Sequence, residues 1–292
     1  MQAARSAFGL CRAGLGRLHR SVPASPSGPG WRFTGTVQEV SIQGGIEDTT
    51  FPVAFGIDAP AAAVRYAVYR GFADTGAAPS PGEVAEQVGL GVPEVHAALR
   101  RLADVHVLVL NQAGDAVRMA HPFSAAPMGY VVTAAGVSTA TGFPGDRVWW
   151  GGCAWDSFGI SAALGERVTV TTQCPHCEVV LRHTSSPEDP PALAAVVHVP
   201  WPAYYWWDDV VATCTRIRTF CSAAHVRRWL AGRDDGGRGG REGTIVALER
   251  MWLLGHRWYA DRLDPQWRPR SREAAQEILA GVGMTETFWD LP

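Results

Sequence analysis

The sequence predicts an α+β fold, in which a helical N-terminal part precedes a small mixed β-sheet domain with flanking helices. Three observations support this fold class. Helix caps and apolar side chains at helical spacing dominate before residue 105. Short strand-like runs separated by turns follow between residues 105 and 199. The composition, 47% hydrophobic and 18% charged, is that of a chain with a packed core.

Three helices and a β-hairpin are predicted between residues 51 and 125. Residues 61–72 carry apolar side chains at helical spacing. Ser80-Pro81-Gly82-Glu83 is a capping box with proline at the first helical position, and Pro93 opens a third helix. A strand, a turn and a return strand over 105–119 form the hairpin. This order of elements is typical of a winged helix.

A winged helix can bind DNA through its third helix. Here Arg100 and Arg101 are flanked by Glu94 and Asp104, and the formal net charge of the chain is −2. Specific DNA binding needs a basic surface, so this is a poor electrostatic footprint. We therefore expect a packing module without a specific nucleic-acid partner. We also expect no membrane partner, because no apolar run is long enough to span a bilayer.

The chain is expected to divide into four parts. These are a flexible N-terminal segment at 1–50, a winged-helix-like domain at 51–125, a mixed β-sheet domain at 126–233, and a linker with a helical C-terminal extension at 234–292. Helices are predicted in the extension at 245–263 and 271–280. The segment before Glu39 is rich in arginine and serine and lacks acidic residues, which resembles a mitochondrial transit peptide. We favour a disordered segment of a cytoplasmic protein, with a mitochondrial location as the alternative.

Residue usage excludes some chemistry and favours other chemistry. All 26 basic residues are arginine, so a phosphate-loop lysine, a Schiff-base lysine and a lysine general base are excluded. Five of the six cysteines lie between Cys153 and Cys221. A chain of 292 residues can bury a core without disulfide bonds, so clustered thiols indicate metal binding or thiol chemistry.

Cys153 and Asp156 are the first candidate site residues. Their spacing places both side chains on one face of a helix predicted over 153–164. Nearby tryptophans would remove water from the carboxyl group, raise its pKa and keep a proton available for donation. The alternative is a small buried cysteine and an acidic residue in a first helical turn. His121, upstream of the pair, is expected to be a hydrogen-bonded structural residue.

Cys221 is the second candidate thiol. It precedes Ser222, a plausible N-cap for a helix that runs to Leu230. A thiol at a helix N-terminus has a lowered pKa, and Arg216 and Arg218 would act in the same direction. We therefore expect a reactive thiolate, with a buried structural cysteine as the alternative.

Cys174-Pro175-His176-Cys177 forms a Cys-x-x-Cys turn with two further interpretations. A disulfide oxidoreductase would place the first cysteine at a helix N-terminus, whereas a strand is predicted after Cys177. A zinc knuckle needs two more ligands, which Cys214, Cys221 or His225 could supply, although the spacing matches no standard zinc finger.

Taken together, these residues resemble the alkylmercury lyase (organomercurial lyase) family between residues 61 and 230. The matching positions are Cys153-Ala154-Trp155-Asp156, Leu164-Gly165-Glu166-Arg167, Cys174 and Phe220-Cys221. The predicted winged helix fits the N-terminal half of this family. Three departures are Ser222, where members often have a second cysteine, the additional Cys177, and the additional long tail from Ile245 to Pro292.

The resemblance implies an alkylmercury lyase-type β-sheet domain and cleavage of carbon–mercury bonds by protonolysis. Cys153 and Cys221 would be the mercury-binding thiolates, and Asp156 would be the proton donor and a ligand of the product metal. Cys174 would match the family's structural cysteine. Cys177, which the family does not share, is a further structural candidate. Mercury is here the substrate metal, and no resident cofactor is expected, with zinc at Cys174 and Cys177 as an alternative. The product Hg(II) would pass to a mercuric reductase or to cellular thiols.

Two other functions compete with this one. The first is a non-catalytic, zinc-stabilised protein that uses the cysteines of the same region. The second is a winged-helix regulator that senses a metal through those thiols. The arrangement of side chains separates the first of these from a lyase. A lyase brings Cys153, Asp156 and Cys221 together, whereas a zinc site gathers Cys174 and Cys177 with two partners.

Overall fold

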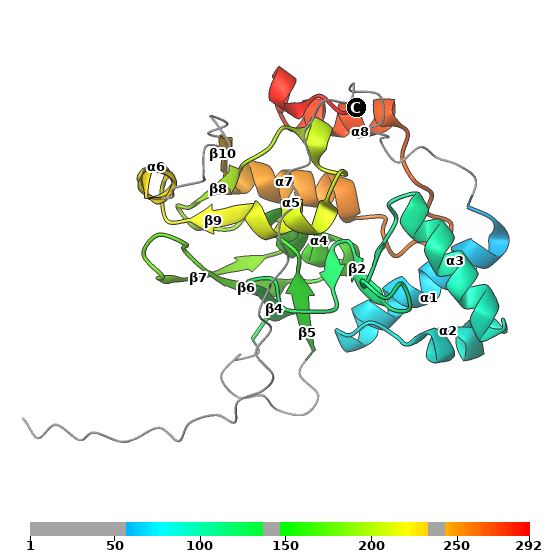
Figure 1. Ribbon diagram of the computed structural model, residues 1–292. Coiled ribbons are helices and arrows are strands. Elements are labelled where there is room, and N and C mark those ends of the chain that lie inside the picture. The colour runs from blue at the N-terminus through cyan, green and yellow to red at the C-terminus, as the bar shows by residue number, and fades with distance from the viewer. Residues whose placement is uncertain (1–56, 137–146, 233–242) are drawn as a thin grey trace, which may run out of the picture. The chain divides into compact units, whose positions relative to one another are not determined.

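The fold is taken from a computed structural model that describes residues 57–136, 147–232 and 243–292 (Figure 1). These ranges all belong to one compact unit of the chain. The predicted flexible segment at 1–50 lies outside the described residues, as does most of the predicted linker after residue 233. None of the helices within the described ranges has the length and apolar character that a bilayer span requires.

Three helices open the described chain, namely α1 (Ala59–Thr75), α2 (Pro81–Val88) and α3 (Val92–Asp104). The expected capping box at α2 is present, with Glu83 N–H donating to Ser80 Oγ and Ser80 N–H donating to the Glu83 carboxylate. The buried guanidinium of Arg65 donates to the carbonyl oxygens of Arg262 and Asp264. The first helix is therefore fixed to the C-terminal part of the chain.

The larger sheet has seven antiparallel strands in the order β1-β2-β3-β5-β4-β6-β7. Their bounds are β1 Val109–Leu110, β2 Val117–Ala120, β3 Phe123–Ser124, β4 Tyr130–Ala134, β5 Val148–Gly151, β6 Val168–Gln173 and β7 Val180–Ser185. The predicted hairpin is the pair β1–β2, and β2 also pairs with β3. The hairpin that follows the helices is thus an edge of the same sheet that carries the later strands.

A second sheet has three antiparallel strands in the order β10-β8-β9. The strands are β8 (Val196–Val199), β9 (Arg218–Phe220) and β10 (Thr244–Ala247). β10 corrects the sequence prediction, which placed the start of a helix at residue 245. Its backbone pairs with β8 over four positions, and the helix begins only at Leu248.

The described residues form five further helices, which are α4 (Ala154–Leu164), α5 (Val210–Arg216), α6 (Ala223–Ala231), α7 (Leu248–Tyr259) and α8 (Arg272–Gly281). Two 3-10 turns lie at Ala203–Tyr205 and Thr287–Trp289. The mixture of sheets and helices confirms the predicted α+β class. The winged-helix interpretation of residues 51–125 stays a prediction.

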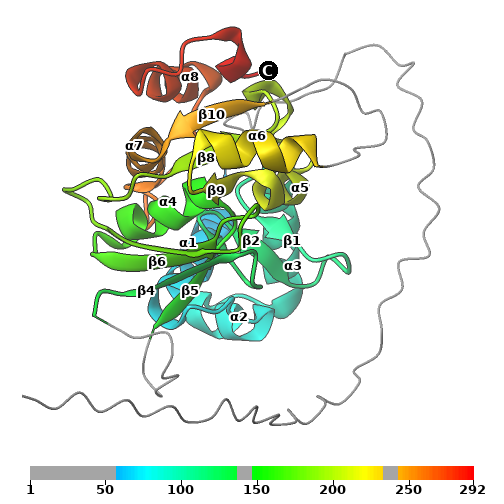
Figure 2. The same ribbon diagram turned by 90° about the vertical axis from the view of Figure 1, so that its left-hand side faces the viewer.

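Helices α4 and α7 pack side by side (Figures 1 and 2). Two glycines permit this close approach. A Cβ at Gly255 would lie 2.9 Å from Cβ of Phe158, and a Cβ at Gly159 would overlap the ring of Tyr259. Larger side chains at either position would force the two helices apart. The packing brings the end of α7 to the beginning of α4.

Candidate active site

The site begins at the N-terminus of α4, where Cys153 is the N-cap residue. The cysteine is fully buried, and its Sγ accepts a hydrogen bond of 3.4 Å from the backbone N–H of Asp156. A cap of this kind satisfies one of the free N–H groups of the first helical turn. Gly152 precedes it, and a Cβ there would lie 2.5 Å from Oδ2 of Asp156. The sequence Gly152-Cys153 therefore leaves room for the carboxyl group beside the thiol.

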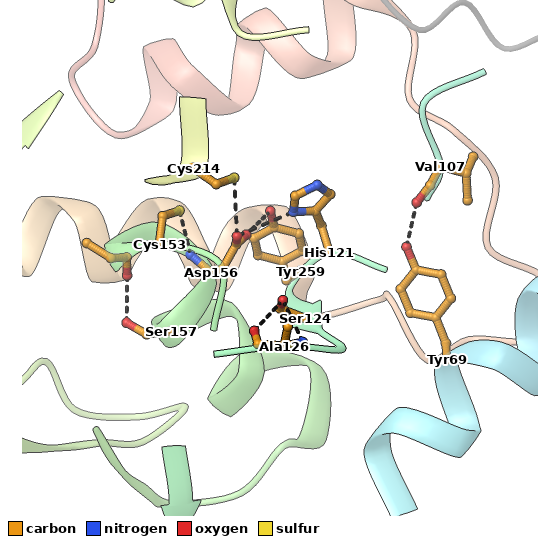
Figure 3. A network of polar contacts seen from close by, with 11 residues as sticks. Tyr69, Val107, His121, Ser124, Ala126, Cys153, Asp156, Ser157, Cys214 and Tyr259 are labelled. Atoms are coloured by element: carbon orange, nitrogen blue, oxygen red, sulfur yellow. Dashed lines mark hydrogen bonds and ion pairs between the residues drawn. The ribbon is translucent and has the colours of Figure 1, made fainter. Parts of the chain in front are cut away.

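Asp156 is the centre of a polar network (Figure 3). Its side chain is 1% exposed. The hydroxyl of Tyr259 donates a 2.7 Å hydrogen bond to Oδ1, and the thiol of Cys214 donates to Oδ2 at 3.6 Å. Nδ1 of His121 lies 3.3 Å from Oδ2. Three separate parts of the chain thus converge on one buried carboxyl group, and both of its oxygens have partners.

Cys153 and Cys214 are adjacent thiols. Burial raises the pKa of Cys153, and the nearby Asp156 adds to this effect. The pKa of Cys214 is raised well above its ordinary value, first by its hydrogen bond with Cys153 and then by burial. Both thiols are therefore protonated at neutral pH. The site can provide protons for transfer as well as sulfur ligands for a metal.

Tyr259 stays protonated for the same physical reason. Burial raises the pKa of its phenol well above the ordinary value, and the neighbouring Asp156 raises it further. The hydroxyl is therefore a permanent hydrogen-bond donor to Asp156. Tyr259 ends α7, in the region that the sequence predicted to be an extension outside the site.

A cavity of about 100 Å³ opens beside this network. Asp156, Cys214, Tyr259 and His121 are among its lining residues. Its remaining wall is rich in indole rings, from Trp155, Trp206, Trp207, Trp258 and Trp267. Such a wall favours an apolar group, because burying hydrocarbon removes it from water at little polar cost. Cys153 is not a lining residue, so Cys214 is the more accessible of the two thiols.

The structure separates the predicted trio. Cys153 and Asp156 lie together as expected, but Cys221 belongs to a second cluster with Cys174, Cys177 and His225. Cys214, which precedes β9, donates a hydrogen bond to Asp156, whereas Cys221 follows β9 and lies in the other cluster. The two cysteines also belong to different apolar clusters, Cys214 to the main core and Cys221 to a smaller one.

The pKa of Cys221 is raised, whereas the sequence predicted a lowered value. Burial and the neighbouring thiols of Cys177 and Cys174 raise it to about 12. His121, which we expected to be only structural, lies against Asp156 and lines the cavity. Sequence reasoning missed Tyr259 and the tryptophans of α7 and its surroundings altogether.

Comparison with known proteins agrees with the resemblance. The sequence model described as alkylmercury lyase matches residues 123–260. Among solved structures, the "crystal structure of the mercury-bound form of MerB2" is similar with a TM-score of 0.51 and 18% identity. This match covers 71% of this chain and 93% of that chain, and at such identity it shows a common fold. A search of curated proteins found no match.

The matched residues contain Cys153, Asp156, Cys214 and Tyr259, and His121 lies just before them. The match also includes both sheets from β3 onward and the whole of α7. Residues 123–260 therefore match the alkylmercury lyase family, and this match indicates an alkylmercury lyase-like enzyme.

Proposed function

We propose that the protein cleaves the carbon–mercury bond of organomercurials by protonolysis at Asp156. The observation that carries this proposal is a buried carboxyl group in contact with a thiol, next to a second thiol, at the wall of an aromatic cavity. Mercury(II) is a soft ion that prefers sulfur ligands, so two thiols suit it. In this proposal Cys214 takes the role that the sequence assigned to Cys221.

Cys214 binds the substrate first, because it lines the cavity and Cys153 does not. A sulfur–mercury bond forms as the ligand that accompanies the organomercury cation leaves. The thiol proton passes to Oδ2 of Asp156, which already accepts the hydrogen bond from Cys214. A proton that was part of the resting site thereby reaches the carboxyl group without crossing bulk water.

Cys153 then adds the second sulfur–mercury bond. The Cys153 proton passes to solvent, where it balances the charge of the ligand displaced in the first step, and the Cys214 proton remains on Asp156. The two sulfurs raise the electron density on the mercury-bound carbon, which makes that carbon easier to protonate. Asp156 delivers its proton there as the carbon–mercury bond breaks. The products are a hydrocarbon and Hg(II) bound to two thiolates, with Asp156 as a further ligand, and no oxidation state changes.

Tyr259 and His121 act through Asp156 in this scheme. The tyrosine hydroxyl holds Oδ1, so the carboxyl group presents Oδ2 toward Cys214 and the substrate. Both residues are therefore positioning residues. The indole-lined cavity holds the organic group and excludes water from the reacting carbon.

The same proposal extends to the product and to the N-terminal helices. Hg(II) would leave by ligand exchange to cellular thiols or to a mercuric reductase in the cytoplasm. The winged-helix-like helices would pack against the rest of the chain and would not bind DNA specifically. The hydrogen bonds from Arg65 to the carbonyl oxygens of Arg262 and Asp264 support packing. Arg101 of α3 forms an ion pair with Asp58.

The decisive experiment is incubation of the purified protein with phenylmercury and excess thiol, followed by measurement of released benzene. Wild-type protein and Cys221→Ser should release benzene, and Cys214→Ser should not. Benzene release by Cys214→Ser at the wild-type rate would refute the assignment of Cys214. No release by well-folded wild-type protein would refute the proposed reaction.

A further inference from the structure

Four potential metal ligands lie together away from Asp156. They are the thiols of Cys174, Cys177 and Cys221 and an imidazole nitrogen of His225, and all four ligand atoms lie within 4.8 Å of one another. Two parts of the chain supply them, the turn between β6 and β7 and the beginning of α6 (Figures 1 and 2). The reaction proposed above uses none of these residues.

The turn that carries Cys174 and Cys177 has a tight, defined backbone. The Cys174 N–H donates to the Val179 carbonyl at 3.0 Å, and the Glu178 N–H donates to the Cys174 carbonyl at 2.9 Å. Glu178 has a φ of 59°, in the left-handed region that a non-glycine residue rarely adopts. A turn of this shape folds back on itself and brings both cysteines to one side of the hairpin.

The other two ligands are set by the first turn of α6. Ser222 is the N-cap and accepts a hydrogen bond from the His225 N–H at 3.3 Å. Cys221 lies immediately before this cap, and His225 lies four residues after Cys221. Both side chains reach the two cysteines of the hairpin turn.

The distances between ligand atoms fit a tetrahedron around zinc. Sγ of Cys177 lies 3.6 Å from Sγ of Cys221, and Sγ of Cys174 lies 3.5 Å from Nδ1 of His225. Tetrahedral zinc with its usual bond lengths requires sulfur–sulfur edges of roughly 3.8 Å and sulfur–nitrogen edges of roughly 3.5 Å. The cysteines are free thiols, so these separations do not come from a disulfide bond.

We propose that Cys174, Cys177, Cys221 and His225 form a structural zinc site that joins the β6–β7 hairpin to α6. The set of three thiolates and one imidazole is a common ligand set of closed, four-coordinate zinc sites. The apolar cluster here is small, with Cys174, Leu181, Phe220 and Val226 as its buried members. A metal bond stabilises such a small cluster more than its apolar area alone can.

The site is separate from Asp156, so its test does not depend on the proposed reaction. The full-length protein is purified in reducing buffer, dialysed against buffer with Zn²⁺ and then without it, and its metal content is measured. Wild-type protein should retain about one zinc per chain, as one tetrahedral site requires. Replacement by Co²⁺ should give the visible absorption of a tetrahedral site and a sulfur-to-cobalt charge-transfer band. Cys177→Ser, at the most exposed ligand, should lose both, as should His225→Ala.

Cys214→Ser is the matched control, because His121, Asp156 and Cys214 form another group of potential ligands. It should keep the zinc and the cobalt spectrum. If the ligand variants do not fold, removal of zinc from wild-type protein by a chelator should lower the Tm, and Zn²⁺ but not Mg²⁺ should restore it. Zinc retained by both ligand variants, zinc lost in Cys214→Ser, or a Cys177–Cys221 disulfide in place of metal would each overturn the proposal.

Discussion

The hydroxyl of Tyr259 and Oδ1 of Asp156 are joined by a 2.7 Å hydrogen bond across 103 positions of the chain. Both side chains are almost fully buried, so this bond forms where water competes little with it. It connects the end of α7 to the first turn of α4. The bond fixes the carboxyl group that we propose as the proton donor, and it makes the role of Tyr259 testable.

Tyr259→Phe should slow carbon–mercury cleavage while leaving capture of the mercurial nearly unchanged. Loss of the hydroxyl leaves a buried acceptor without its partner, which costs about 1–3 kcal/mol and corresponds to a slowing of roughly 5- to 150-fold if it falls on the transition state. Single-turnover cleavage and a binding titration measure the two steps separately. Tyr69→Phe is the control, because Tyr69 is equally buried and donates to Val107 instead. Equal losses in the two variants would indicate a purely structural role for Tyr259.

Cys214→Ser and Cys221→Ser should fail differently. A hydroxyl is a poor ligand for a soft metal, so Cys214→Ser should lower turnover by at least about 10³-fold. Cys221→Ser should keep the turnover of whatever fraction folds, because Cys221 lies in the other cluster. Turnover per folded molecule, with the folded fraction taken from circular dichroism, makes the comparison. The reverse pattern would restore the role that the sequence assigned to Cys221.

The pair Cys153–Asp156 could be predicted from sequence, because residues three apart at a helix N-terminus meet by local geometry alone. The choice between Cys214 and Cys221 could not. Cys214 lies near the end of α5 and Cys221 just before α6, on either side of β9, and only the position of β9 in its sheet decides which thiol reaches Asp156. Tyr259 gave no local signal at all, since its place depends on the close packing of α4 and α7.

The same distinction applies to the fold. The helix caps at Ser80 and Ser222 could be predicted from the sequence, because a cap is a contact between residues three apart. Residues 245–247 were predicted to be helical and belong to β10 instead. Short apolar runs are ambiguous between helix and strand, and here pairing with β8 determines the outcome. Strand β4 was likewise missed, although it lies between β5 and β6 in the larger sheet.

Gly152→Ala should impair cleavage without unfolding the protein. The new methyl group would meet the flexible end of Met119 and, at 2.5 Å, Oδ2 of Asp156, so the carboxyl group must move away from its position beside Cys214. A displacement of about 1 Å at a reacting group can cost about 10²-fold in rate. The loss should appear in single-turnover cleavage. Gly82→Ala is the control, because only Ser80 Oγ, at 3.9 Å, lies within 4 Å of a Cβ there. Unchanged cleavage in Gly152→Ala would mean that the position of Oδ2 does not matter.

The stability of the protein should fall as the pH rises above about 8.5, the ordinary pKa of an unfolded thiol. The folded-state pKa of Cys214 is raised, so folded protein holds this proton after the unfolded chain has lost it. The stabilisation is therefore fully present below the unfolded pKa and is lost as the pH rises through the folded one. Urea unfolding at several pH values measures the slope. Cys214→Ser should make the slope shallower by up to about 1.4 kcal/mol per pH unit, and an unchanged slope would contradict this account.

Asp156→Asn should separate capture of the substrate from cleavage. Asparagine keeps the size and polarity of aspartate but cannot deliver an acidic proton. Cys153 and Cys214 remain, so the variant should still bind the mercurial and displace its leaving ligand. General acid catalysis is typically worth about 10² to 10⁴ in rate, and cleavage should slow by that factor.

The bound organic group should then be visible by mass spectrometry as a protein adduct that persists in the variant and disappears in wild type. Asparagine also cannot take up the Cys214 proton, so capture should slow slightly at neutral pH. If Asp156→Asn releases hydrocarbon at the wild-type rate, the proton comes from another group, and His121, 3.3 Å from Oδ2, becomes the first candidate.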